Sequence, residues 1–130
     1  MDKSIIKVRS MSFKYADKYI FKDFDMDINT NSFVCIIGRN ASGKSTLVKI
    51  LGGLCKASGY INVDGYLLND TYIKKIRRSL AICFDDADRH FIGDTVFDDL
   101  AFSLENLGYF PKEIENMVNN IAKKFKIDDR

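Results

Sequence analysis

The stretch GRNASGKS, residues 38–45, decides the fold that this sequence can adopt. It matches the pattern G-x-x-x-x-G-K-[S/T] at every fixed position. The five residues before it, FVCII at 33–37, are apolar on both faces and predict a buried strand. After the stretch, apolar residues recur at helical spacing, namely Leu47, Val48, Ile50, Leu51 and Leu54. A strand, a glycine-rich loop and a helix in this order predict a loop that wraps around phosphate groups.

Each residue type in this loop has a physical role in holding a phosphate chain. Gly38 and Gly43 let the backbone bend so that successive amide N–H groups face one anion. The positive end of the helix dipole adds to the attraction. Lys44 is expected between the β- and γ-phosphates, the Ser45 hydroxyl on Mg²⁺, and the Thr46 hydroxyl on a phosphate oxygen. The alternative, a chance glycine turn or a relic of such a loop, is disfavoured by the strand and helix around it.

Composition narrows the class of protein. The chain has 130 residues, 46% hydrophobic and 29% charged, which suits one globular domain with a real core. A net charge of +2 gives no strong attraction to nucleic acid or to an acidic membrane. The longest apolar runs are too short to span a bilayer, and the N-terminus lacks an apolar signal core, so we expect a cytosolic chain. Three widely spaced cysteines without a CxxC pair predict reduced thiols that fill strands.

The residues upstream of the loop alternate between apolar and polar. Residues 6–15 form one such run, with a slip at Ser10 that predicts a bulge. Residues 24–28 form another, in which apolar side chains alternate with aspartates. Two alternating strands without a helix between them predict an antiparallel sheet. Tyr15 ends the first run, where an aromatic ring can stack on a nucleotide base, although an ordinary edge-strand tyrosine is the alternative.

Helical signals dominate the second half of the chain. GYINVDG, residues 59–65, predicts one more short strand, and residues 72–79 a short basic helix. Thr95 with Asp98 predicts a capped helix that Gly108 ends, and the proline at 111 begins another helix with an apolar stripe. We therefore predict an α/β fold: a partial P-loop NTPase core with an N-terminal antiparallel β-layer and a C-terminal helical segment.

A second apolar run, LAICF at 80–84, predicts another buried strand and leads directly into Asp85 and Asp86. One interpretation is the acidic strand end of a compact GTPase or kinase, with Asp85 on Mg²⁺ and Asp86 as the base. Two observations weaken it. DADR, residues 86–89, lacks the glycine that a GTPase has after such a strand, and no Asn-Lys-x-Asp base-reading motif is present.

GRNASGKSTL, preceded by FKY and followed by GYINVDG, resembles the ATP-binding subunits of ABC transporters. The stretch DRHFIGDTVFDDLAFSLENLG, residues 88–108, is similar to the segment after the Q-loop in import ATPases of the energy-coupling-factor class. The similarity rests on Phe91, Thr95-Val96, Asp98-Asp99, Phe102 and residues 104–106.

This resemblance implies an ATP and Mg²⁺ site in which Tyr15 stacks on adenine. The phosphate-binding residues that it implies are Gly38, Arg39, Asn40, Ala41, Ser42, Gly43, Lys44, Ser45 and Thr46. It places Asp85 where the family has the Q-loop glutamine, which contacts magnesium and the attacking water. Residues 85–106 are then expected to face a transmembrane transporter subunit. The resemblance also implies a second ATPase subunit in a homo- or heterodimer, no nucleic-acid partner, and a cytoplasmic location, peripheral on the inner face of the cell membrane.

The chain departs from the family pattern in two ways. Asp85, Asp86 and Ala87 replace Gln-Asn-Pro, and a carboxylate cannot donate a hydrogen bond to a phosphate oxygen although it can bind Mg²⁺. The signature motif, Walker B acid, catalytic glutamate and switch histidine are not present in these 130 residues. We therefore expect one incomplete ABC-type domain, with an antiparallel part at 1–31, a P-loop core at 32–84 and a Q-loop and helical part at 85–130. Nucleotide binding with little hydrolysis alone is the expected behaviour; a non-catalytic nucleotide-binding module is the alternative.

Overall fold

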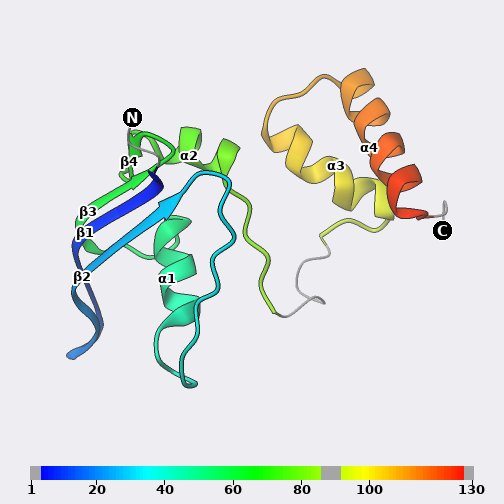
Figure 1. Cartoon of the computed structure of the whole chain (residues 1–130). Coiled ribbons are helices and arrows are strands. Elements are labelled where there is room, and N and C mark those ends of the chain that lie inside the picture. Colours follow the sequence, from blue (N-terminus) through cyan, green and yellow to red (C-terminus); the bar gives the residue numbers. More distant parts are fainter. Residues whose placement is uncertain (1–3, 86–91, 128–130) are drawn as a thin grey trace. The chain divides into compact units, whose positions relative to one another are not determined.

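A computed structural model of the chain describes residues 4–85 and 92–127 (Figure 1). The chain divides into two compact units, Met1–Ile82 and Cys83–Arg130. Three residues with an expected role, Asp86, Ala87 and Phe91, lie outside the described residues.

The first unit is built on a four-stranded sheet with the strand order β2-β1-β3-β4 (Figure 1). The strands are β1 (Ser4–Tyr15), β2 (Lys18–Asn29), β3 (Ser58–Val63) and β4 (Tyr66–Leu67). All three neighbouring pairs are antiparallel, as the alternating runs predict.

The bulge predicted at Ser10 is present and determines which side chains reach the core. Ser10 has φ 47°, and the pairing of β1 with β2 shifts between Val8 and Met11. Because the bulge adds a residue, Val8 and Met11 are both fully buried although they stand three positions apart. The strand alongside accommodates the bulge with Gly59, where a Cβ would lie 2.5 Å from the Ser10 carbonyl oxygen.

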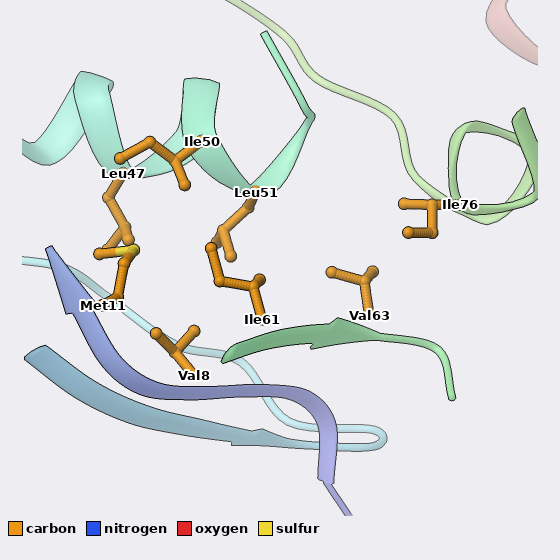
Figure 2. Packing of buried hydrophobic residues seen from close by; sticks show 8 residues of the cluster. All are labelled: Val8, Met11, Leu47, Ile50, Leu51, Ile61, Val63 and Ile76. Atoms are coloured by element: carbon orange, nitrogen blue, oxygen red, sulfur yellow. The ribbon is translucent and has the colours of Figure 1, made fainter. Parts of the chain in front are cut away.

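Helix α1 (Lys44–Leu51) packs across one face of this sheet. Figure 2 shows its apolar side chains directed at those of β1 and β3, with Ile76 of α2 (Ile73–Ser79) beside Val63. The buried cluster consists of Val8, Met11, Leu47, Ile50, Leu51, Ile61, Val63 and Ile76. The helix ends at Leu51 with Gly52 as its C-cap, three residues before Leu54, the last residue of the helical pattern in the sequence.

The two apolar runs predicted as buried strands, 33–37 and 80–84, are not strands, and those predictions are wrong. Neither belongs to a sheet within the described part of the chain. Phe33 is 96% exposed and Ile37 is 89% exposed. An apolar composition on both faces indicates that a segment favours burial, but a strand also needs neighbours to complete its backbone hydrogen bonds. In the described residues, neither run pairs with β2 or β4, the two edge strands of the sheet.

The second unit is a pair of helices, α3 (Val96–Asn106) and α4 (Pro111–Phe125). The predicted cap is confirmed, because the Thr95 Oγ1 accepts a hydrogen bond from the Asp98 amide at 3.1 Å. Gly108 follows α3 with φ 81°, and Pro111 occupies the first turn of α4. The two helices meet through Ala101, Ile114 and Val118. In the described ranges, no helix combines the length and the apolar character that crossing a bilayer requires.

Replacing Ile50 by alanine tests the contact between α1 and the sheet. Ile50 is 0% exposed, and its loss is expected to lower the free energy of unfolding by about 2–5 kcal/mol, because a cavity replaces a packed side chain. The measurement is urea denaturation followed by circular dichroism. Val48→Ala is the matched control on the same helix, since Val48 is 36% exposed; it is expected to cost less than about 1 kcal/mol. Equal losses in the two variants would contradict the packing described here.

Candidate nucleotide-binding site

The glycine-rich loop enters α1 through two residues in the left-handed region. Ala41 has φ 62° and Gly43 has φ 99°, and between them the Ser42 amide donates to the Arg39 carbonyl at 3.2 Å. Gly43 then caps α1, because its carbonyl accepts the first helical hydrogen bond from the Leu47 amide at 2.8 Å. The loop is therefore a tight turn that points into the start of the helix.

Gly43 also brings the loop against the sheet. A Cβ at this position would lie 2.6 Å from Ile20 Cγ2 and 3.0 Å from Phe21 Cζ, both on β2. The backbone also has positive φ here, so glycine is favoured both by the lack of space for a Cβ and by the backbone conformation. Strand β2 thus fixes the place where the helix begins.

Lys44 folds its side chain back over the loop. Its ammonium donates to the carbonyl oxygens of Gly38 and Arg39, each at 2.8 Å. An ammonium group has three N–H donors, so one remains for a further acceptor. The positive charge is in this way held beside the loop backbone, where a phosphate group would be wrapped.

The donors at this point fit an anion of the phosphate type. The first amides of a helix have no acceptor within the helix, and those of α1 belong to Lys44, Ser45 and Thr46. No acidic residue occupies the first turn of α1, so the positive end of the helix is not neutralised there. The Ser45 hydroxyl is on an exposed residue, and Thr46 is half-buried. The remaining predicted residues of the loop, Arg39, Asn40, Ala41 and Ser42, are all exposed.

Tyr15 lies at the end of β1 and is 51% exposed. Its ring meets the Phe13 ring edge-on, with centroids 4.9 Å apart and an interplanar angle of 89°. Phe13 pairs across the sheet with Phe21, the same residue that approaches Gly43. The β1–β2 hairpin therefore carries both the predicted base-stacking ring and the contact that seats the phosphate loop.

Asp85 is exposed and belongs to the second unit, whereas the loop belongs to the first. The structure thus carries Tyr15 and the loop on one framework within the first unit. Among residues 4–85 and 92–127, no three or more His, Cys, Asp or Glu side chains gather in a way that could hold a metal ion.

Three contacts at the site were not foreseen from the sequence. Ile20 and Phe21 touch the loop at Gly43, and the Tyr15 hydroxyl lies 3.9 Å from Cys55 Sγ. The alternation in β2 indicates that it is a strand, but not that it reaches Gly43. Cys55 stands 40 positions from Tyr15, and no local pattern links the two.

Known proteins resemble this chain in sequence and in fold. The energy-coupling factor transporter ATP-binding protein EcfA of Pediococcus pentosaceus is 40% identical over 130 residues, which cover 97% of this chain and 46% of the relative. The protein EcfA1 of Ligilactobacillus salivarius is 42% identical over 129 residues, covering 97% and 45%. The chain spans about half the length of these relatives.

Among solved structures, cbiO1 from Clostridium perfringens, part of the ABC transporter complex cbiONQ, superposes with a TM-score of 0.81. The two are 30% identical, and the match covers 98% of this chain and 52% of cbiO1. This similarity confirms the α/β fold class predicted from the sequence, including its partial extent. Residues 21–130 match the family described as ABC transporter, and the chain therefore belongs to the ABC transporter family.

Proposed function

We propose that this chain is the ATP-binding part of an ABC import system of the energy-coupling-factor type. The observation that carries the proposal is the loop at 38–46, which leads into the open amides at the start of α1 and holds the Lys44 ammonium against its own backbone. The relatives named EcfA and EcfA1 support it, since they are ATP-binding proteins of energy-coupling factor transporters. Coupling of ATP binding and hydrolysis to transport then belongs to the chain completed by a second half and by its partner subunits.

ATP binding follows from the geometry of the loop. The phosphate chain would accept hydrogen bonds from the amides at the start of α1, and the ammonium of Lys44 would exchange one of its loop carbonyls for a phosphate oxygen. Mg²⁺ would neutralise phosphate charge, with Ser45 as one ligand and Asp85 as a second. Tyr15 would stack on adenine with its exposed ring.

The residue at position 85 bears on whether bound ATP would be hydrolysed. With a carboxylate at the glutamine position, the residue accepts hydrogen bonds but donates none to a phosphate oxygen. This supports a second candidate function, a nucleotide-binding module that does not hydrolyse ATP. A compact GTPase or kinase is disfavoured, because the run before Asp85 forms no strand and the chain belongs to the ABC transporter family.

The second unit is proposed as the side that meets a membrane partner. Residues 85–106 would contact a transmembrane transporter subunit, and α3 presents exposed aromatic side chains there, with Phe97 and Phe102 both more than two-fifths exposed. The proposed location is cytoplasmic, peripheral on the inner face of the cell membrane, with a second ATPase subunit in a homo- or heterodimer. The proposed domain has three parts: an antiparallel part at residues 1–31, a P-loop core at 32–84, and a Q-loop and helical part at 85–130.

Lys44→Ala tests the phosphate site. Hydrogen bonds to charged groups contribute about 1.5–3 kcal/mol, so the variant is expected to bind ATP roughly 10- to 150-fold more weakly. Isothermal titration calorimetry with Mg²⁺ and ATP measures the loss. Lys49→Ala is the matched control, because Lys49 lies in the last turn of the same helix, where its charge does not face the loop. If Lys44→Ala and Lys49→Ala bind ATP equally well, the phosphate loop is not the nucleotide site.

Asp85→Asn tests whether this carboxylate binds the metal. Removing the charge is expected to tighten ATP binding in EDTA by roughly 1.5- to 5-fold, since a like charge near the phosphates is lost. The gain in affinity that Mg²⁺ brings should shrink in the same variant, because one oxygen ligand is weaker. Asp94→Asn is the control, as Asp94 is exposed in the same acidic stretch. The same Mg²⁺ dependence in both variants would place Asp85 away from the metal.

A further inference from the structure

The ring of Tyr15 is held at two points. Phe13 meets it edge-on, and an edge-on contact uses at most one face of the Tyr15 ring. At the far end of the ring, the hydroxyl group lies 3.9 Å from the Sγ atom of Cys55, and either group can donate. The ring is thus oriented from two directions while at least one face stays open for a flat ligand.

Cys55 is itself fixed to the helix that begins at the phosphate loop. The Lys49 carbonyl in the last turn of α1 accepts hydrogen bonds from the amides of Leu54, at 2.8 Å, and Cys55, at 3.3 Å. Gly53, with φ 68°, makes the turn that allows this return. The thiol that meets Tyr15 therefore lies in the turn that is hydrogen-bonded to the last turn of α1, and the opposite end of this helix is the phosphate loop.

From these contacts we propose that Cys55 is a positioning residue for the base-stacking ring of Tyr15. It would tie the orientation of the ring, at the base end of the site, to α1, at the phosphate end. The inference rests on the proposed function, since it takes Tyr15 to be the residue on which adenine stacks.

Cys55 also packs against the buried cluster under α1, so a purely structural role has to be separated from a positioning role. The surroundings of the side chain make this possible. Cys55 borders a cavity of about 240 Å³, which is also lined by Ile61, Leu68 and Ile73. A valine at position 55 has room for its extra methyl group there, and it keeps the apolar packing while it removes the thiol.

The experiment compares ATP with inorganic tripolyphosphate, which has the phosphate chain but no base. Cys55→Val is expected to bind ATP roughly two- to tenfold more weakly, the range that loss of one oriented aromatic contact gives, with unchanged affinity for tripolyphosphate. Cys55→Ser keeps a donor and an acceptor and is expected to retain most of the ATP affinity. Cys35→Val is the matched control, since Cys35 is an exposed cysteine of the same unit, and it should change neither affinity.

Three outcomes would overturn the inference. Unchanged ATP affinity in Cys55→Val shows that the thiol does not position the ring. An equal loss for ATP and tripolyphosphate shows a structural role only, and Cys55→Ser behaving like Cys55→Val shows that no polar contact is involved. Tyr15→Ala distinguishes these outcomes from a failure of the proposed function. If this variant keeps its ATP affinity, adenine does not stack on Tyr15. The proposed stacking and the proposed positioning role of Cys55 are then both wrong. If Tyr15→Ala weakens ATP and Cys55→Val does not, only the positioning role is wrong.

Discussion

The close approach of Gly43 to strand β2 is the constraint on which the rest of the site depends. The glycine stands where a Cβ would collide with Ile20 and Phe21, and its positive φ directs the chain from the loop into α1. Once α1 starts there, its side chains Leu47, Ile50 and Leu51 pack against the sheet (Figure 2). They meet Val8 and Met11 of β1, which lie on the same face of the sheet because of the bulge at Ser10. The amides at the start of the helix are then left open toward an anion. The contact of Gly43 with β2 therefore contributes both to the packing of the core and to the exposure of the amides at the phosphate site.

Much of this arrangement could be predicted from local sequence. The loop, the bulge, and the cap formed by Thr95 with Asp98 all depend on residues a few positions apart, and each is present. What failed was the assignment of residues 33–37 and 80–84 as buried strands. Their apolar composition reflects a preference for burial, but whether a strand forms depends on partners that local sequence does not specify. The contacts of Gly43 with β2 and of Tyr15 with Cys55 were missed for a related reason, because they join segments distant in the chain.

The candidate site residues with mutual contacts all belong to one unit of the chain. The loop, Tyr15 and Cys55 all lie in Met1–Ile82, connected through the hairpin and through α1. Asp85 lies in Cys83–Arg130 together with the helices proposed to meet the membrane partner. Under the proposed function, nucleotide binding belongs to the first unit and contact with a membrane partner to the second.

The central claim is that the amides at the start of α1 bind the phosphate chain of ATP. The most direct measurement is the change of backbone amide chemical shifts by NMR as Mg²⁺ and ATP are added to isotopically labelled protein. The largest changes are expected on residues 40–46, with smaller changes on Tyr15 and its neighbours. Tripolyphosphate is expected to reproduce only the changes in the loop. Large changes elsewhere with none in residues 40–46 would contradict it.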